Sequence, residues 1–145
     1  MLTGIGHVAF RVRDLQRALD FYCGKLGLRE AFRLERAGRP SPWIVYLQLA
    51  ENAFIELFPV PDDPVNAADP QASYSHACLT VDDLQATLAQ FAARGLEIAG
   101  EPKLGLDGNW QYWLTDPDGN RLELMQMMPD SLQAAAGAAL RAARG

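Results

Sequence analysis

The sequence is poor in the residues that build disulfide frameworks, zinc sites and nucleic-acid surfaces. Its 145 residues include two cysteines and two histidines, and Cys23 and Cys78 lack the short spacings of metal or redox motifs. We therefore expect both thiols to stay reduced, as in a cytoplasmic protein. The net charge of −5 argues against a nucleic-acid partner, and the chain has no lysine- or arginine-rich run that would favour a membrane surface.

Long apolar runs are also missing. No stretch is long enough to span a bilayer, and Met1 leads into a strand-like segment without the basic flank and apolar run of a signal peptide. With 49% hydrophobic and 21% charged residues, the composition is globular. The chain length suits one domain with a substantial core. We expect a soluble, cytoplasmic protein without a membrane partner.

What the sequence does contain is an internal repeat. Alternating residues from Ile5 predict a strand that carries His7, and Asp14 then caps a helix with apolar residues at helical spacing. The same order returns 69 residues later with His76 and Asp83. Three further strand-like segments follow the helix in each half. The sequence therefore predicts an α+β fold with two βαβββ modules.

The module boundaries follow from the proline pattern. We expect module 1 over residues 4–60, a proline-rich linker over 61–73 and module 2 over 74–128, together forming one domain. Asp130 is a candidate cap for a last, alanine-rich helix within a tail over residues 129–145. This helix lies outside the repeat, and it is either an arm that packs on a partner subunit or a frayed tail.

An Asp-Pro-Asp-Gly-Asn sequence before the last strand predicts a three-residue hairpin loop with a bulge. Its proline suits the start of a type I turn, and Gly119 can take the positive φ that this loop requires. The resulting register places Trp113 opposite Glu123, with Gln111 on the same face and Tyr112 on the other. Glu123 is then a carboxylate among apolar neighbours, which needs a positively charged partner.

Four metal-binding residue types fall at repeat-equivalent positions. A single histidine on an apolar strand is usually a core residue, but His7 and His76 match each other, and a shift of 67 matches Glu56 with Glu123. We expect a curved sheet to bring these four residues into one cleft. Two imidazoles and two carboxylates suit one divalent ion, namely Ni²⁺, Co²⁺, Mn²⁺, Fe²⁺ or Zn²⁺. The ion would supply the positive charge that both buried glutamates need.

The sequence resembles the vicinal oxygen chelate superfamily, whose best-known member is glyoxalase I. The resemblance covers about residues 4–128 and implies paired βαβββ modules cupped around one divalent metal, commonly in a homodimer. The four ligand positions of the family are occupied here by His7, Glu56, His76 and Glu123. The resemblance is carried by Gly6-His7-Val8-Ala9, Asp14-Leu15, Phe21-Tyr22, Leu26-Gly27, Phe54-Ile55-Glu56-Leu57, His76, Val81-Asp82-Asp83, Asp116-Pro117-Asp118-Gly119-Asn120 and Leu122-Glu123-Leu124.

The resemblance implies a metal-dependent lyase, isomerase or epimerase that enolises a small α-hydroxycarbonyl or keto substrate. Glu123 and Glu56 are the candidate catalytic bases, since in glyoxalase I a glutamate ligand also removes the proton. Two other classes remain open. One is an Fe(II) ring-cleaving dioxygenase. Such enzymes use two histidines and one carboxylate, so Glu56 as a fourth ligand argues against this class. The other is a metal-free drug-binding resistance protein, against which the intact ligand set speaks.

The substrate is less constrained than the metal. Arg11 matches an arginine that glyoxalase I uses to hold glutathione, although it is equally a charged residue at a strand end. Val60, however, stands where the bacterial enzyme has an asparagine for the peptide. The loop over residues 103–109 resembles that of methylmalonyl-CoA epimerases, yet those enzymes carry glutamine at the position of Glu56.

Aromatic and polar residues near the last hairpin offer a further clue to the substrate. Gln111 and Trp113, together with Arg11, are the candidate substrate contacts. The tryptophans and their neighbours suit a hydroxylated small molecule, but they are equally consistent with an ordinary strand core. A glutathione adduct, an acyl-CoA, a sugar and a cyclitol all stay open.

Overall fold

The computed structural model describes residues 5–60 and 75–144, which form two similar α/β modules. The predicted βαβββ duplication is confirmed. The first module consists of β1 (His7–Val12), α1 (Leu15–Leu19), the π-helical segment η1 (Asp20–Lys25), β2 (Arg29–Leu34), β3 (Ile44–Ala50) and β4 (Ala53–Pro59). The second consists of β5 (Ala77–Thr80), α2 (Leu84–Ala93), β6 (Lys103–Leu104), β7 (Trp110–Thr115) and β8 (Arg121–Gln126), and α3 (Leu132–Arg144) follows it.

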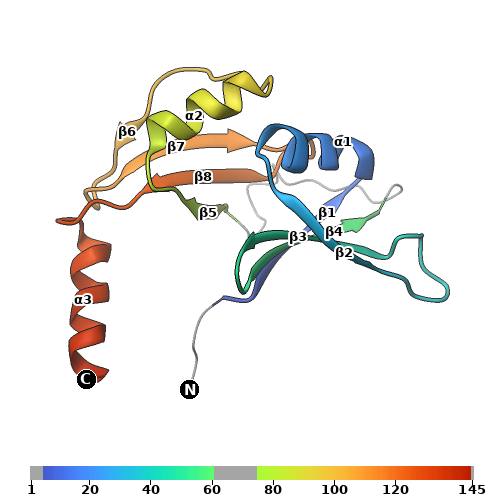
Figure 1. Ribbon diagram of the computed structural model, residues 1–145, viewed down its shortest axis with the longest axis horizontal. Helices are drawn as coiled ribbons and strands as arrows, with labels where there is room; N and C mark the ends of the chain where they lie inside the picture. The colour runs from blue at the N-terminus through green and yellow to red at the C-terminus, as the bar shows by residue number, and fades with distance from the viewer. Residues whose placement is uncertain (1–4, 61–74, 145) are drawn as a thin grey trace.

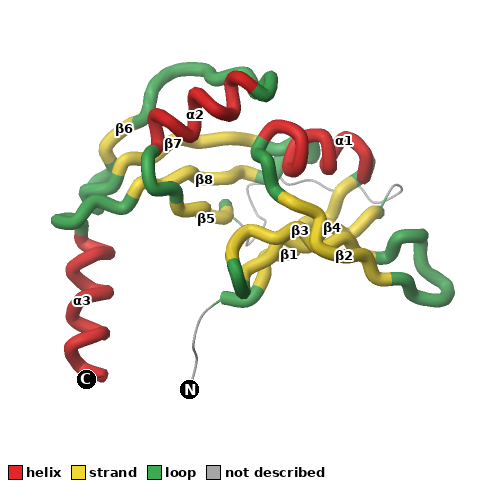
Figure 2. Tube along the Cα trace, viewed as in Figure 1, coloured by secondary structure: helices red, strands yellow, loops and turns green. Residues whose placement is uncertain are grey.

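Each module builds its own four-stranded mixed sheet (Figures 1 and 2). The first sheet has the order β1-β4-β3-β2 and the second has the order β5-β8-β7-β6. In both, the first strand runs parallel to the last strand of its module, and the other pairs are antiparallel. The expected single curved sheet is therefore a pair of sheets, because β1 and β5 form the outer edges of separate hydrogen-bonded ladders.

One face of each sheet is covered by a helix and the other is open (Figure 1). Helices α1 and α2 lie on the same side of the molecule, and a common core joins them to both sheets. In β1 the side chains of Phe10 and Val12 enter this core, while His7 and Arg11 alternate to the other side. We call the face of each sheet that lies opposite its helix the open face of that sheet. Each open face carries the candidate ligands of its own module.

The helix starts follow the sequence closely. Asp14 accepts a hydrogen bond from the backbone N–H of Arg17 at 3.0 Å, and Asp83 accepts one from Ala86 at 2.9 Å. These bonds satisfy backbone donors that would otherwise lack partners at a helix N-terminus. Both aspartates are thus the caps that the repeat predicts.

The last hairpin has the predicted bulged turn and register. Gly119 takes a φ of +91°, and the backbone N–H of Asp116 donates to the carbonyl of Asn120 at 2.9 Å. Trp113 pairs with Glu123, and Tyr112 is buried on the helix side. The prediction that Tyr112 and Trp113 point to opposite faces is therefore confirmed.

This turn also joins the two modules. The buried carboxylate of Asp116 accepts hydrogen bonds from the hydroxyl of Tyr22 in η1, from two backbone N–H groups and from the Asn120 amide, at 2.8–2.9 Å. Asp118 accepts bonds from the backbone N–H and the guanidinium of Arg13, at 3.1 and 3.3 Å. The turn that shapes β7 and β8 thereby fastens module 2 to module 1.

Helix α3 extends away from both sheets (Figure 1). Its cap is Ser131, whose hydroxyl accepts from the N–H of Ala134 at 3.2 Å, so the predicted cap at Asp130 is wrong by one residue. The buried Asn109 donates to the side chain of Gln133 at 2.7 Å, and this contact anchors the first turn. Whether the helix packs on a partner subunit stays a prediction.

The proline-rich linker predicted over residues 61–73 lies outside the described residues, and the module boundaries stay predictions. No helix in the described part of the chain is long and apolar enough to cross a membrane.

Candidate active site

The first candidate pair lies on the open face of the first sheet. His7 and Glu56 come from the neighbouring parallel strands β1 and β4, with Ala9 as the strand partner of Glu56. The His7 Nδ1 atom lies 3.5 Å from the Glu56 Oε1 atom. Glu56 is only 4% exposed, whereas the His7 side chain is 53% exposed. The pair therefore consists of a buried carboxylate under an accessible imidazole.

The second pair repeats this arrangement in module 2. His76 stands directly before β5, and its Nε2 atom lies 3.2 Å from the Glu123 Oε2 atom on β8. Glu123 is 6% exposed. The imidazole meets the ring of Trp113 edge-on at 4.8 Å, and the guanidinium of Arg121 lies 4.6 Å from the centre of the same ring. Trp113 therefore helps to orient His76.

Each glutamate has a further donor that differs between the modules. Tyr46 is the strand partner of Glu56, and the hydrogen bond between them raises the pKa of the Tyr46 phenol. Cys78 is the strand partner of Glu123, and desolvation together with the negative charge of Glu123 raises the pKa of its thiol to about 11. Both groups are therefore protonated donors at neutral pH. The phenol is the stronger donor and the thiol the weaker.

The structure brings the four candidate ligands together as two pairs. Among the described residues, no group of three or more histidine, cysteine, aspartate or glutamate side chains could hold a metal ion. The expected cleft with all four residues is thus not formed within one chain, because each pair belongs to the open face of its own sheet. Two buried carboxylates, each beside an imidazole, nevertheless fit a divalent metal as two halves of a ligand set.

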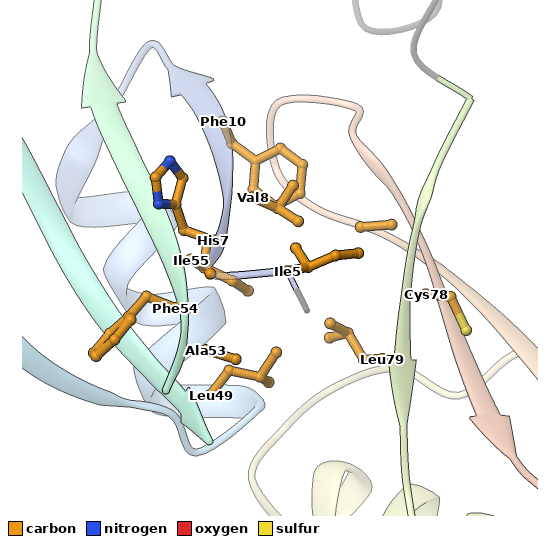
Figure 3. A pocket seen from close by; sticks show the side chains of 12 residues that line it. Ile5, His7, Val8, Phe10, Leu49, Ala53, Phe54, Ile55, Cys78 and Leu79 are labelled. Atoms are coloured by element: carbon orange, nitrogen blue, oxygen red, sulfur yellow. The ribbon is translucent and has the colours of Figure 1, made fainter. Parts of the chain in front are cut away.

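A hollow of about 140 Å³ lies between the two modules, where β1 and β5 approach each other (Figure 3). Side chains such as Ile5, Val8 and Leu79 line it, while the imidazole of His7 and the thiol of Cys78 point away from it on opposite sides. The hollow is therefore an apolar seam on the core side of the strands. The candidate ligands lie on the other side of the same strands.

The predicted substrate contacts lie on the same open faces as these pairs. Arg11 is exposed and shares a face of β1 with His7. Gln111 and Trp113 share the open face of β7, as the register predicted. The Gln111 amide reaches Asp107 at 3.4 Å, and a side chain at Gly105 would come within 2.5 Å of both. A side chain at this position would therefore require the side chains of Asp107 and Gln111 to move.

Two neighbours of the candidate ligands, Tyr46 and Cys78, were missed from the sequence. Tyr46 could have been found by applying the 67-residue shift to Trp113, which places both residues opposite the glutamates of their modules. Cys78 could have been found by strand alternation, because it follows His76 by two residues. Its equivalent in module 1 is Ala9, which carries no polar group.

Comparison with known proteins agrees with this architecture. Residues 4–124 match a family described as the Glyoxalase/Bleomycin resistance protein/Dioxygenase superfamily. The chain is 30% identical over 126 residues to a probable lactoylglutathione lyase of Synechocystis sp., a match that covers 83% of this chain and 92% of the relative.

Solved structures show the same similarity. A glyoxalase family protein from Enterococcus faecalis has 25% identity and a TM-score of 0.71, over 85% of this chain and 97% of that one. A bleomycin-binding protein complexed with bleomycin has 28% identity and a TM-score of 0.61, over 88% of this chain and 100% of that one. The chain therefore belongs to the Glyoxalase/Bleomycin resistance protein/Dioxygenase superfamily, as the sequence resemblance indicates.

Proposed function

We propose that the protein is a divalent-metal-dependent enzyme that enolises a small α-hydroxycarbonyl or keto substrate, as in lactoylglutathione lyase or an epimerase. The observation that carries this proposal is the repeated pairing of a buried glutamate with a histidine, His7 with Glu56 and His76 with Glu123, at 3.5 and 3.2 Å. Burying one carboxylate in this way is costly, and burying two at equivalent positions indicates a shared task. The similarity to a probable lactoylglutathione lyase supports the same class.

The two half-sets also support a homodimer. Each chain has two ligand pairs on separate open faces, so the first pair of one subunit and the second pair of its partner together make the two-imidazole, two-carboxylate set that a divalent ion prefers. In this arrangement a dimer would contain two identical sites. The proposal thus assigns His7, Glu56, His76 and Glu123 as ligands.

A bound divalent ion would supply Lewis-acid stabilisation of the negative charge that develops on the substrate oxygens. The chain itself supplies the proton transfer. We assign Glu123 as the base that removes the α-proton, since both glutamates have a histidine neighbour but the further donor to Glu123 is the weak Cys78 thiol and not a phenol. We assign Glu56 to proton transfer at the opposite face of the substrate. The hydrogen bond from Tyr46 orients the Glu56 carboxylate. Return of the proton by Glu123 to the adjacent carbon gives isomerisation, and return to the original carbon from the other face gives epimerisation.

The experiment combines metal analysis with proton exchange. We expect about one divalent ion per chain, and loss of tight binding in His7→Ala and in His76→Ala, since each removes an imidazole from the set. Loaded protein in D₂O should introduce deuterium at the α-carbon of a carbonyl substrate. The substrates to test are the methylglyoxal–glutathione hemithioacetal, an acyl-CoA with an epimerisable centre, and keto-sugars or keto-cyclitols.

Three results would overturn the proposal. Full metal occupancy in both histidine variants would exclude the assigned ligands. Oxygen consumption with a catechol and Fe²⁺, without exchange on any carbonyl substrate, would replace the proposal with the dioxygenase alternative. Tight binding of bleomycin by protein that takes up no metal would replace it with the drug-binding alternative.

A further inference from the structure

Three aromatic rings from three neighbouring strands meet on the open face of the first sheet. Phe32 on β2 stacks on Tyr46 on β3 with 4.3 Å between the ring centres and 21° between the ring planes. Phe54 on β4 lies 6.3 Å from Phe32 and 6.1 Å from Tyr46. We call these three residues the ring platform. Phe32 is 45% exposed, so an aromatic surface faces solvent.

A β-bulge places Phe32 in this cluster. Arg29 pairs with Gln48 and Glu30 with Leu47, so a regular ladder would put Ala31 opposite Tyr46. The register instead shifts between Glu30 and Phe32, and Phe32 becomes the partner of Tyr46. A bulge redirects side chains and is common beside active sites. The exposed ring is therefore a consequence of an irregular strand, whereas a regular strand would have placed a methyl group there.

The ring platform is continuous with the first ligand pair. Tyr46 stacks on Phe32 and also bonds through its hydroxyl to Glu56. Phe54 precedes Glu56 by two residues on the same face of β4 and is the strand partner of His7. Helices α1 and α2 lie on the other face of the sheets (Figure 1). A molecule that reaches Glu56 from the open face therefore lies beside these rings.

The equivalent surface of module 2 differs in chemistry. Trp113 takes the place of Tyr46 opposite the glutamate, but the guanidinium of Arg121 lies over its ring at 4.6 Å. The guanidinium covers one face of this ring and adds a positive charge beside it. Trp113 is 41% exposed, so both open faces carry exposed aromatic surface, and the ring platform differs by grouping three rings from neighbouring strands.

We propose that the ring platform of Phe32, Tyr46 and Phe54 binds a planar apolar group, such as an aryl ring, attached to the reacting carbonyl of the substrate. This inference rests on the proposed function and specifies its substrate class. Aromatic rings prefer offset-stacked or edge-to-face contacts with one another, and a flat substituent is the group that gains from both. Binding of this substituent would also remove the exposed surface of Phe32 from water.

The kinetic test compares two substrates that differ only in this group. The hemithioacetals of glutathione with phenylglyoxal and with methylglyoxal share the same reacting atoms. We expect kcat/KM to favour the phenyl substrate, and Phe32→Ala to lower this preference about tenfold. Phe32→Leu keeps apolar volume without a ring and should lower it in the same direction. Leu106→Ala changes a fully exposed residue of module 2 and serves as the matched control.

A binding test separates this inference from the proposed function. Benzohydroxamate and acetohydroxamate both offer two vicinal oxygens, and only the first carries a ring. Titration calorimetry with Ni²⁺-loaded protein should give tighter binding of benzohydroxamate, and Phe32→Ala should reduce the difference. If this preference is found while no carbonyl substrate exchanges its proton, the ring platform stands and the proposed reaction fails.

Equal binding of the two hydroxamates, with proton exchange intact, would overturn the ring platform alone. The same holds if Phe32→Ala lowers activity on both hemithioacetals equally and converts dimers to monomers in light scattering. The rings would then cover another copy of the chain.

Discussion

Glu56 and Glu123 occupy equivalent positions in the two modules, but their neighbours differ. Each is buried beside a histidine, so the duplication sets the geometry of both pairs. Glu56 accepts a bond from a phenol beside exposed aromatic rings, whereas Glu123 lies next to a thiol that replaces Ala9 of the first module. The repeat thus conserves the candidate metal ligands and varies the residues that decide how each carboxylate is used.

The modules also differ in the turns before their last strands. The module 1 turn at residues 51–52 is a short Glu-Asn sequence, whereas the module 2 turn carries Asp116 and Asp118. These aspartates bond to Tyr22 and Arg13 of module 1. The second turn therefore adds polar bonds between the modules to the apolar core that they share.

The largest effect should come from removing the proposed base, Glu123, and comparing that loss with the removal of Glu56. We predict that Glu123→Gln loses about 10²–10⁴-fold in solvent proton exchange, the usual contribution of one general base. Glu56→Gln should lose less, because we assign Glu56 to the opposite face of the substrate. Deuterium incorporation at saturating metal measures both variants under the same conditions. A greater loss in Glu56→Gln would reverse the assignment.

The next effect concerns the connection between the modules. Asp116→Ala leaves the hydroxyl of Tyr22 and the Asn120 amide without their buried acceptor, so we predict destabilisation by about 3 kcal/mol. Tyr22→Phe removes one bond to the same carboxylate and should cost about 1 kcal/mol. Chemical denaturation monitored by circular dichroism gives both values. Equal losses in the two variants would show that the Asp116 carboxylate contributes to stability only through its bond with Tyr22.

The smallest effect should come from making the second face more like the first. Cys78→Ala introduces the residue that module 1 has at Ala9, and we predict a change in stability of about 0.5 kcal/mol or less. Because burial and Glu123 raise the pKa of the Cys78 thiol to about 11, the thiol stays neutral below about pH 9. The pH profile of proton exchange should therefore keep its shape in that range. A shifted profile would mean that the thiol takes part in proton transfer.

The helix caps and the register of the last hairpin were predictable from the sequence, because each depends on residues close together in the chain. Asp14 and Asp83 cap their helices as expected, since a cap involves only the next three residues. The register of Trp113 with Glu123 followed from the turn between them. The last helix was misjudged by one residue at Ser131, because either neighbouring polar side chain could serve as the cap.

Features that depend on distant strands were not predictable in the same way. The bulge that brings Phe32 opposite Tyr46 is decided by how β2 packs along β3, and a regular alternation puts Ala31 there. The role of Asp116 also extends beyond its turn, since its partner Tyr22 lies 94 residues away. Pattern alone gives no distance between such residues.

The sequence by itself determined the family, the duplication and the identity of the four candidate ligands. These depend on residue type and spacing, and both are read directly from the chain. Only the tertiary structure decided that His7 lies beside Glu56 on one sheet and His76 beside Glu123 on the other. The reason is that a strand fixes which face a side chain occupies, whereas the hydrogen bonds between strands decide which faces meet.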